Sequence, residues 1–275
     1  HIEVGFAHNN LGKLKMSFGL LEDAEYRFRQ DLAIKRQVVE QNPKHNLWRG
    51  YLASSYVWLG RLLNSRGSLA ESSDQGEAAL ETLNDLLEID PTMTPRRQTR
   101  AEAQKLRAAN CRLLQKPECA ASHISAALAD LDQLTSANPE NAQWQRDLSA
   151  CRLEAAWQAA IAGKTKFAMA LTESVMESTR PTGEGELDDK ETIKLFMTAM
   201  LTRGDIAAKT NQPDDAREAW RIVLDTLEDY FPNARDPEVI DISAKLMARV
   251  GNVAMAEDTQ ATLRRMSYQS SYPLL

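Results

Sequence analysis

The fold is decided by residues 46–91, which read NLWRGYLASSYVWLGRLLNSRGSLAESSDQGEAALETLNDLLEIDP. In the first half, mainly apolar residues follow the spacing i, i+3, i+4, i+7, i+8, i+11 and i+15 of one α-helical face. These residues are Trp48, Tyr51, Leu52, Ser55, Tyr56, Leu59 and Leu63, of which Ser55 is polar. Gly67 interrupts this pattern, and a second helical run, with Leu80, Leu83, Leu86 and Leu87, continues to Asp90-Pro91. The stretch predicts a hairpin of two amphipathic helices.

The turn residue of this hairpin and the small residue that follows it recur along the chain. A turn residue followed five positions later by a small residue occurs at Gly19/Ala24, Gly67/Ser72, Gln115/Ala120, Gly163/Ala168 and Asn211/Ala216. Successive copies are 48 residues apart, and Gly251/Ala256 follows after a further 40. Amphipathic helices cannot bury their apolar stripes alone, so neighbouring hairpins must stack and share a core. We therefore predict an all-α solenoid of stacked antiparallel helix pairs, with about six hairpins.

The repeat defines one domain over residues 1–275. Its units are expected at 1–42, 43–90, 91–138, 139–186, 187–235 and 236–266, followed by a C-terminal tail over 267–275.

The amino-acid composition supports an all-α fold and excludes some classes of binding partner. Of the 275 residues, 43% are hydrophobic and 26% charged, with 12 glycines and 10 prolines. These values are typical of a folded helical protein, and no apolar run reaches the roughly 18 residues of a membrane span. The net charge of −6 argues against direct binding of nucleic acid. The chain starts at His1, so we expect it to be a piece of a larger protein.

The repeat resembles the tetratricopeptide repeat, in which Leu-Gly, Gly, Ala, an aromatic residue and Pro recur at fixed places. Matching residues in three units are Leu11-Gly12, Gly19, Ala24, Phe28 and Pro43; Leu59-Gly60, Gly67 and Pro91; and Gly204, Ala216, Trp220 and Pro232. The third unit departs from this pattern, with Ala108 and Gln115 where glycines are usual. Each unit exceeds the 34-residue form by 14 residues, close to four helical turns. Residues 139–149, PENAQWQRDLS, resemble the long repeats of bacterial multidomain signalling proteins.

The resemblance implies a right-handed superhelix whose first helices line a concave groove that binds protein or peptide. The groove positions carried over are Asn9, Lys13 and Met16; Val57, Arg61 and Asn64; Lys105, Ala109 and Arg112; Leu153, Trp157 and Ile161; Leu201, Asp205, Ala208 and Lys209; and Asp241, Lys245 and Arg249.

A basic stripe marks the third unit. At 100° per residue, Lys105, Arg112 and Lys116 fall within about 40° of one another on a helix. One interpretation is a groove that takes a carboxylate or acidic peptide through charge-assisted hydrogen bonds. The alternative is a solvated face that neutralises neighbours such as Glu88 and Asp90.

The fourth unit carries a second apolar stripe. Leu153, Trp157 and Ile161 recur at i, i+4 and i+8, offset from a core stripe that includes Trp144 and Leu148. An accessible tryptophan in a concavity is a common anchor for a partner side chain. The alternative is that neighbouring units bury both stripes.

Motifs of catalysis and metal binding are absent. The chain has no phosphate-binding glycine loop, serine-hydrolase elbow or zincin helix, so we expect no enzyme and no cofactor. Cys119 and His123 stand i, i+4 on one helix, but two ligands leave a four-coordinate zinc half empty. Cys111 and Cys151 lie on apolar stripes and are expected in the core. Three cysteines do not form a disulfide framework, which favours a reducing compartment.

Two segments fall outside the repeat pattern. Residues 182–189, TGEGELDD, are expected to form a mobile acidic connector rather than a calcium loop. Tyr268, Tyr272, Pro273 and Leu274 are expected to fold onto the last helices, the alternative being a docking motif for another protein.

The leading hypothesis is a non-catalytic scaffold that binds a protein or peptide with acidic and hydrophobic residues, as a module of a larger bacterial signalling or regulatory protein. A second hypothesis is homodimerisation through terminal repeats, and a third is a small-ligand sensor at the apolar patch. The expected compartment is the cytoplasm, or the periplasm if the parent protein is membrane-anchored.

Overall fold

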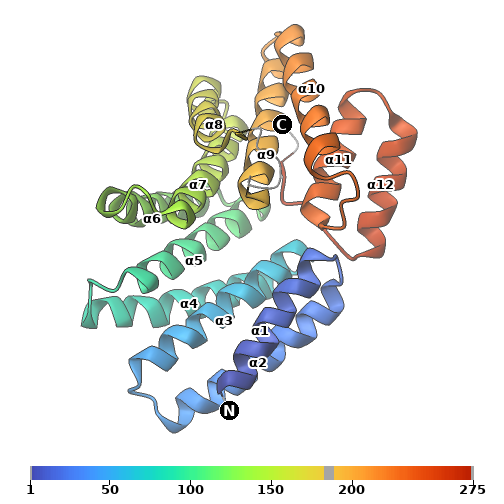
Figure 1. Ribbon diagram of the computed structural model, residues 1–275. Helices are drawn as coiled ribbons and strands as arrows, with labels where there is room; N and C mark the ends of the chain where they lie inside the picture. Colours follow the sequence, from blue (N-terminus) through green and yellow to red (C-terminus); the bar gives the residue numbers. More distant parts are fainter. Residues whose placement is uncertain (1, 183–188, 274–275) are drawn as a thin grey trace. The chain divides into compact units, whose positions relative to one another are not determined.

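The computed structural model describes residues 2–182 and 189–273, and all regular structure within them is helical (Figure 1). The helices are α1 (Ile2–Ser17), α2 (Leu21–Gln41), α3 (Asn46–Ser65), α4 (Leu69–Ile89), α5 (Thr94–Leu113), α6 (Pro117–Ala137), α7 (Ala142–Ile161), α8 (Thr165–Thr179), α9 (Lys190–Lys209), α10 (Pro213–Tyr230), α11 (Pro237–Arg249) and α12 (Val253–Arg265). The predicted all-α class is confirmed.

The helices pair in sequence order as antiparallel hairpins within two compact units. Unit 1 spans residues 1–139 and also includes Met266–Ser271, and its hairpins are α1/α2, α3/α4 and α5/α6. Unit 2 spans residues 140–265 and includes Tyr272, and its hairpins are α7/α8, α9/α10 and α11/α12. Helices α4, α6, α8 and α10 begin at residues 69, 117, 165 and 213, in the expected 48-residue phase.

Each hairpin turns at the residue that the repeat pattern indicated. The turn residues Gly19, Gly67, Gln115, Gly163, Asn211 and Gly251 all have positive φ, between 57° and 80°. The following amide donates to the carbonyl five residues earlier, as from Ser68 to Leu63 and from Lys116 to Cys111. This is the Schellman arrangement, which ends a helix by satisfying carbonyls that its last turn leaves open. The 48-residue repeat is therefore the spacing between helix C-caps in which the turn residue has a left-handed conformation.

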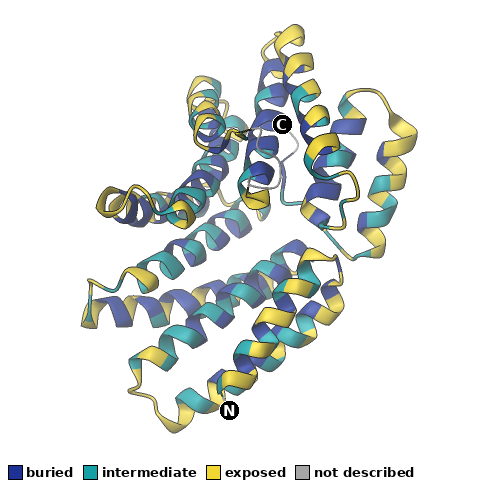
Figure 2. Ribbon diagram, viewed as in Figure 1, coloured by how far each residue is buried: buried dark blue, intermediate teal, exposed yellow. Residues whose placement is uncertain are grey.

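Apolar stripes on facing helices form the core of each unit, visible as dark blue bands in Figure 2. In unit 1, one buried cluster joins Phe28 of α2 to Leu59 and Leu62 of α3. In unit 2, a larger cluster includes Met197 of α9 and Leu246 of α11. Exposed residues lie mainly on the outer sides and at the turns, as expected for stacked amphipathic helices.

Glycines on the first helices allow close helix contact. A Cβ at Gly12 would lie 2.7 Å from the ring of Phe28, and one at Gly204 would lie 2.4 Å from the indole of Trp220. In both hairpins the aromatic residue of the second helix occupies the space above the glycine. This packing gives a physical reason for the Leu-Gly and aromatic positions of the resemblance.

The acidic segment 182–189 and the sixth hairpin were both expected to depart from the regular repeat. The proposed acidic connector, TGEGELDD, falls largely on residues 183–188, which lie outside the described residues. The sixth hairpin is confirmed as shorter than the others, because α11 and α12 have 13 residues each. No helix among the described residues is both long and apolar enough to cross a membrane.

Candidate functional site

Tyr272 is buried among side chains from the first helices of unit 2, and we call these surroundings the tyrosine pocket. Its walls are Trp157 of α7, Asp205 of α9, and Lys245 and Arg249 of α11. The hydroxyl of Tyr272 donates to Oδ2 of Asp205 at 2.9 Å. Its ring meets Trp157 edge to face, with centroids 5.4 Å apart and planes at 66°. Lys245 Nζ and the guanidinium carbon of Arg249 lie 5.5 Å and 5.7 Å from the ring centroid.

Charges in the tyrosine pocket are paired. Arg249 forms an ion pair with Asp205, and Lys245 forms one with Asp241 on the preceding turn of α11. Burial lowers the pKa of Lys245, against the opposing effect of Asp241. Burial and the neighbouring Asp205 raise the pKa of Tyr272 well above its usual value. The pocket therefore favours a neutral phenol that donates a hydrogen bond to a carboxylate.

The helical repeat brings these residues together. Each comes from the first helix of a hairpin, and Asp241, Lys245 and Arg249 are four residues apart on one face of α11. Trp157 is fixed from behind, because its indole Nε1 donates to Thr202 Oγ1 of α9 at 3.0 Å. The sequence pattern selected Trp157, Asp205, Lys245 and Arg249 as groove positions, but it gave no signal that Tyr272 would fill the space between them.

The segment Met266–Ser271 lies against first helices of unit 1. The amide of Gln269 donates to the carbonyl of Ser65 in α3 at 2.7 Å. Arg112 of α5 donates from Nη2 to the carbonyl of Ser271 at 2.9 Å. Tyr268 packs against the buried cluster of the first two hairpins. The expectation that the tail folds onto the last helices is thus wrong for Tyr268 and right for Tyr272, and Leu274 lies outside the described residues.

The predicted groove residues of the first two hairpins differ in how far they are buried. Asn9 and Val57 are buried, so their side chains belong to the helix packing rather than to an open face. Lys13 and Arg61 are half-buried, each over the ring of Trp58 at 4.3 Å and 4.4 Å. Met16 packs beside the same cluster, and Asn64 donates to Asn110 Oδ1 at 2.8 Å.

The basic stripe of the third hairpin is shorter than its spacing suggested. Helix α5 ends at Leu113, and Gln115 has a left-handed conformation, so Lys116 is the exposed N-cap of α6 and does not continue the stripe. Lys105 and Arg112 remain on α5 and are half-buried.

Other basic residues of α5 pair with acids on neighbouring helices. Arg97 and Arg100 both bond to Asp130 of α6, at 3.2 Å and 2.6 Å. Arg107 pairs with Glu77 of α4 at 3.3 Å. Neutralisation of neighbouring acids, the alternative interpretation, holds for these arginines, although the acids differ from Glu88 and Asp90.

The apolar patch of the fourth hairpin divides along α7. Leu153 is buried in a small core cluster, Trp157 walls the tyrosine pocket, and Ile161 is 57% exposed. On α9, Leu201 is buried whereas Ala208 and Lys209 are exposed near the helix end. Ala109 of α5 is half-buried.

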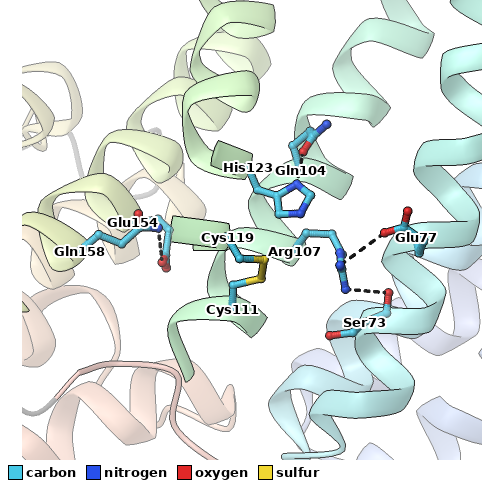
Figure 3. Close-up of a disulfide and its surroundings, with 9 residues drawn as sticks. All are labelled: Ser73, Glu77, Gln104, Arg107, Cys111, Cys119, His123, Glu154 and Gln158. Carbon is cyan, nitrogen blue, oxygen red and sulfur yellow. Dashed lines mark hydrogen bonds and ion pairs between the residues drawn. A yellow bond between two sulfur atoms is a disulfide. The ribbon is translucent and has the colours of Figure 1, made fainter. Parts of the chain in front are cut away.

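A disulfide joins Cys111 of α5 to Cys119 of α6, with their Cα atoms 5.8 Å apart (Figure 3). The prediction from the sequence, that the cysteines form no disulfide framework and that Cys111 is simply a core residue, is therefore wrong about the pairing of Cys111. Cys111 is indeed buried, but the left-handed turn at Gln115 reverses the chain and brings Cys119 against it. The reducing compartment inferred from unpaired cysteines loses that support. Cys151 is buried in unit 2, as expected.

His123 lies beside this cysteine pair. The potential ligand atoms of Cys111, Cys119 and His123 lie within 4.8 Å of one another. Sequence spacing offered only Cys119 and His123 as candidate ligands, because the third residue comes from the preceding helix. Burial and the nearby Arg107 lower the pKa of His123, which favours a neutral imidazole.

Comparisons with known proteins place the fold. Neither protein-family models nor curated protein sequences match the chain. A Rap protein complexed with competence and sporulation factor superposes with a TM-score of 0.70 at 12% identity, over 95% of this chain and 64% of that one. BtubC (BKLC) from P. vanneervenii gives 0.56 at 14% identity, over 90% of each chain. A thermophilic TPR protein from Thermus thermophilus gives 0.47 at 16% identity, over 88% and 99%.

This chain therefore spans less than two thirds of the Rap protein that it resembles. At these identities the likeness concerns the fold alone. The chain has the fold of a TPR-like helical repeat protein, with antiparallel hairpins structurally similar to those of Rap.

Proposed function

We propose that the protein is a non-catalytic scaffold that binds an extended peptide segment of a partner protein on the first helices of its hairpins. The tyrosine pocket carries this proposal. It is a closed site built from three hairpins, and it holds one side chain of an irregular segment through a ring contact and a hydrogen bond. A face that accommodates Tyr272 in this way has the shape and polarity to accept a similar residue from another chain.

The segment makes a different kind of contact in each unit. In unit 1, Ser65 and Arg112 bond to main-chain groups, which every peptide offers. In unit 2, the tyrosine pocket selects for a side chain, because Asp205 accepts the hydrogen bond of the phenol. A phosphotyrosine would place its negative charge against Asp205 and is disfavoured. We propose that the preferred ligand contains an unmodified tyrosine and competes with residues 266–273.

A truncation tests this proposal. A chain ending at Arg265 should bind a fluorescent peptide of residues 266–273, MSYQSSYP, measured by fluorescence anisotropy. The full chain should bind the same peptide at least about tenfold more weakly, because its own segment occupies the site. Circular dichroism of the truncated chain checks that its helices persist.

Two matched controls make the result specific. A peptide with Tyr272→Phe loses the hydroxyl bond to Asp205 and should bind about fivefold to tenfold more weakly, which corresponds to roughly 1 kcal/mol. A peptide with Ser267→Ala, altered at an exposed residue outside the tyrosine pocket, should bind like the parent peptide. Equal binding of all three peptides, or none by the truncated chain, contradicts a side-chain-selective groove.

Acidic residues in the partner are proposed for the neighbourhood of α5. Lys105 and Arg112 are half-buried cations on the same helix, and Arg112 already bonds a carbonyl. Arg112→Glu should weaken capture of a partner from bacterial lysate by the truncated chain, with Lys116→Glu as the control at the helix cap. From the likeness of its repeats to those of bacterial signalling proteins, we propose that the module belongs to a larger signalling or regulatory protein of bacteria.

Self-assembly is the second candidate, and a stripe on α1 favours it. Val4, Leu11 and Leu14 on α1 are between 42% and 52% exposed, and Phe18, in the turn that follows the helix, is 46% exposed. At 100° per residue the three helical residues fall within about 80° of one another. An exposed apolar stripe on the first helix is suited to packing against the same helix of a second copy. Light scattering of the wild type and of Leu14→Lys tests this: a dimer that the substitution dissociates supports it, and a monomeric wild type contradicts it.

A further inference from the structure

A cluster of sulfur and nitrogen atoms closes the third hairpin and is independent of the proposed peptide site. Cys111 lies in the last turn of α5, and Cys119 and His123 lie one turn apart at the start of α6. Among the described residues, these three form the group of cysteine, histidine and acidic side chains that is close enough to share a metal ion. Figure 3 shows His123 beside the sulfur pair.

We propose that reduction of the Cys111–Cys119 disulfide creates a zinc-binding site with two thiolates and the imidazole of His123 as ligands. Thiolate and imidazole are ligands that Zn²⁺ prefers, at about 2.3 Å and 2.0 Å. Tetrahedral geometry would then separate the two sulfurs to about 3.8 Å. The ligand atoms lie within 4.8 Å of one another, so rotation of side chains on a fixed hairpin suffices.

The histidine is already oriented for this role. Its Nδ1 lies 2.5 Å from Oε1 of Gln104 on α5. An amide oxygen only accepts, so Nδ1 carries the hydrogen and the lone pair of Nε2 is left for the metal. A hydrogen bond to the second ring nitrogen is the usual support of a metal-binding histidine. Sequence spacing could not indicate Gln104, because it lies 19 residues away on the preceding helix.

Charge in the surroundings is balanced. Arg107 lies one turn before Cys111 on α5, and its guanidinium favours thiolates over thiols. Arg107 is itself compensated by Glu77 and by the carbonyl of Ser73. Two thiolates, a neutral imidazole and Zn²⁺ sum to zero, which lowers the cost of partial burial. Water supplies the fourth ligand, because Cys119 and His123 are only half-buried.

The chemistry requires a thiol reductant, and a dithiol serves. One thiolate of the dithiol attacks Sγ of half-buried Cys119, and Cys111 leaves as a thiolate. The second thiol of the reductant then attacks its own sulfur in the mixed disulfide and releases the Cys119 thiolate. The protein disulfide gains two electrons, and the dithiol is oxidised to a disulfide. Relative to the two thiols, zinc binding releases two protons.

The test compares the same chain in two redox states. Chain reduced with a dithiol and desalted without oxygen should take up a single Zn²⁺, measured by competition with a chromophoric chelator. Oxidised chain should take up none. Co²⁺ in place of Zn²⁺ should give a thiolate charge-transfer absorption. Failure of the reduced chain to bind either metal overturns the proposal.

Variants separate this site from unspecific binding. Cys119→Ser and His123→Ala should abolish single-site binding or weaken it at least about a hundredfold, whereas Cys151→Ala, in unit 2, should bind like the wild type. Gln104→Ala should keep one site but weaken it about tenfold to a hundredfold, because the imidazole loses its support. Unchanged binding in Cys119→Ser overturns the assignment even if all variants fold.

Discussion

At the scale of single residues, the most buried charges of unit 1 form one network. Asp31 and Lys35 of α2 are 0% and 2% exposed and lie 2.8 Å apart. Asn9 of α1 and Ser55 of α3 both donate to Asp31 Oδ2, at 3.0 Å and 2.6 Å. Three successive helices thus converge on one carboxylate. Burial lowers the pKa of Lys35, and Asp31 opposes that effect.

Breaking this network should be costly. Asp31→Ala leaves Lys35 as a buried cation without its carboxylate, and we expect a loss of about 3–5 kcal/mol in the free energy of unfolding. The double variant Asp31→Leu/Lys35→Met removes both charges and should lose less than the single variant. Urea unfolding followed by circular dichroism measures both, and equal losses would contradict the burial argument.

The phenol of Tyr272 should titrate abnormally. Its pKa is raised by burial and by Asp205, above the unperturbed value of about 10. The folded chain therefore keeps a proton that the unfolded chain loses. The contribution to stability is complete below pH 10 and is lost as the pH rises through the raised pKa.

Ultraviolet difference titration of the wild type against Tyr272→Phe measures this group alone. The difference signal should appear above pH 10. A difference signal centred at about 10 would mean that Tyr272 is not enclosed beside Asp205.

At the scale of helices, the glycines of the first helices have opposite roles. A Cβ at Gly12 would lie 2.7 Å from Phe28, which is fully buried and stacked on Trp58. Gly12→Ala should therefore cost about 1–3 kcal/mol through overpacking. At Gly50, within α3, the nearest atom would be 3.9 Å away, so Gly50→Ala should stabilise by roughly 0.5–1 kcal/mol. Thermal unfolding of both variants checks the sign of each effect.

The helix caps allow a reciprocal test. Gln115 holds φ of 57°, which costs a residue with a Cβ free energy that glycine avoids. Gln115→Gly should stabilise the chain by about 0.5–1 kcal/mol. Gly163 has φ of 74° with open space around it, so Gly163→Ala should destabilise by about 1 kcal/mol through the backbone alone. Chemical unfolding that gave the same sign for both changes would contradict the cap interpretation.

At the scale of the whole molecule, stacked hairpins should respond locally to damage. Within each unit, the hairpins pack mainly against their neighbours in sequence, so stability is close to a sum of local terms. Unit 2 has its own buried charge centre, where Lys194 of α9 contacts Asp236 at 2.8 Å and Glu238 at 3.0 Å, near the start of α11. Damage at Asp31 and at Lys194 should therefore remain in separate units.

Hydrogen exchange with mass spectrometry measures this separation. Asp31→Ala should increase exchange in α1, α2 and α3 and leave α9 and α11 unchanged, and Lys194→Ala should do the reverse. Equal increases throughout both units in both variants would instead indicate a single cooperative unit.

Much of the fold could be predicted from the sequence because its determinants are local. Apolar spacing and turn residues such as Gly67 and Asn211 act within a few residues, and repetition makes their phase readable. The groove positions Trp157 and Asp205 were predictions from the family resemblance, and the structure places both beside Tyr272. The prediction that Lys116 continues the basic stripe is wrong because a helix ends between it and Arg112, and a glutamine holds the turn position that is usually glycine.

Contacts between distant residues depended on tertiary structure. The family resemblance assigned Asp205 to the groove, but only folding brought Tyr272, which belongs to no repeat, to its carboxylate 67 residues away. Folding likewise brought Cys111 to Cys119 across a turn and Gln104 to His123 across two helices. Local sequence determines which face a side chain occupies on its helix. Which side chain this face contacts depends on how segments distant in sequence pack together. The periodicity of the sequence does not determine that packing.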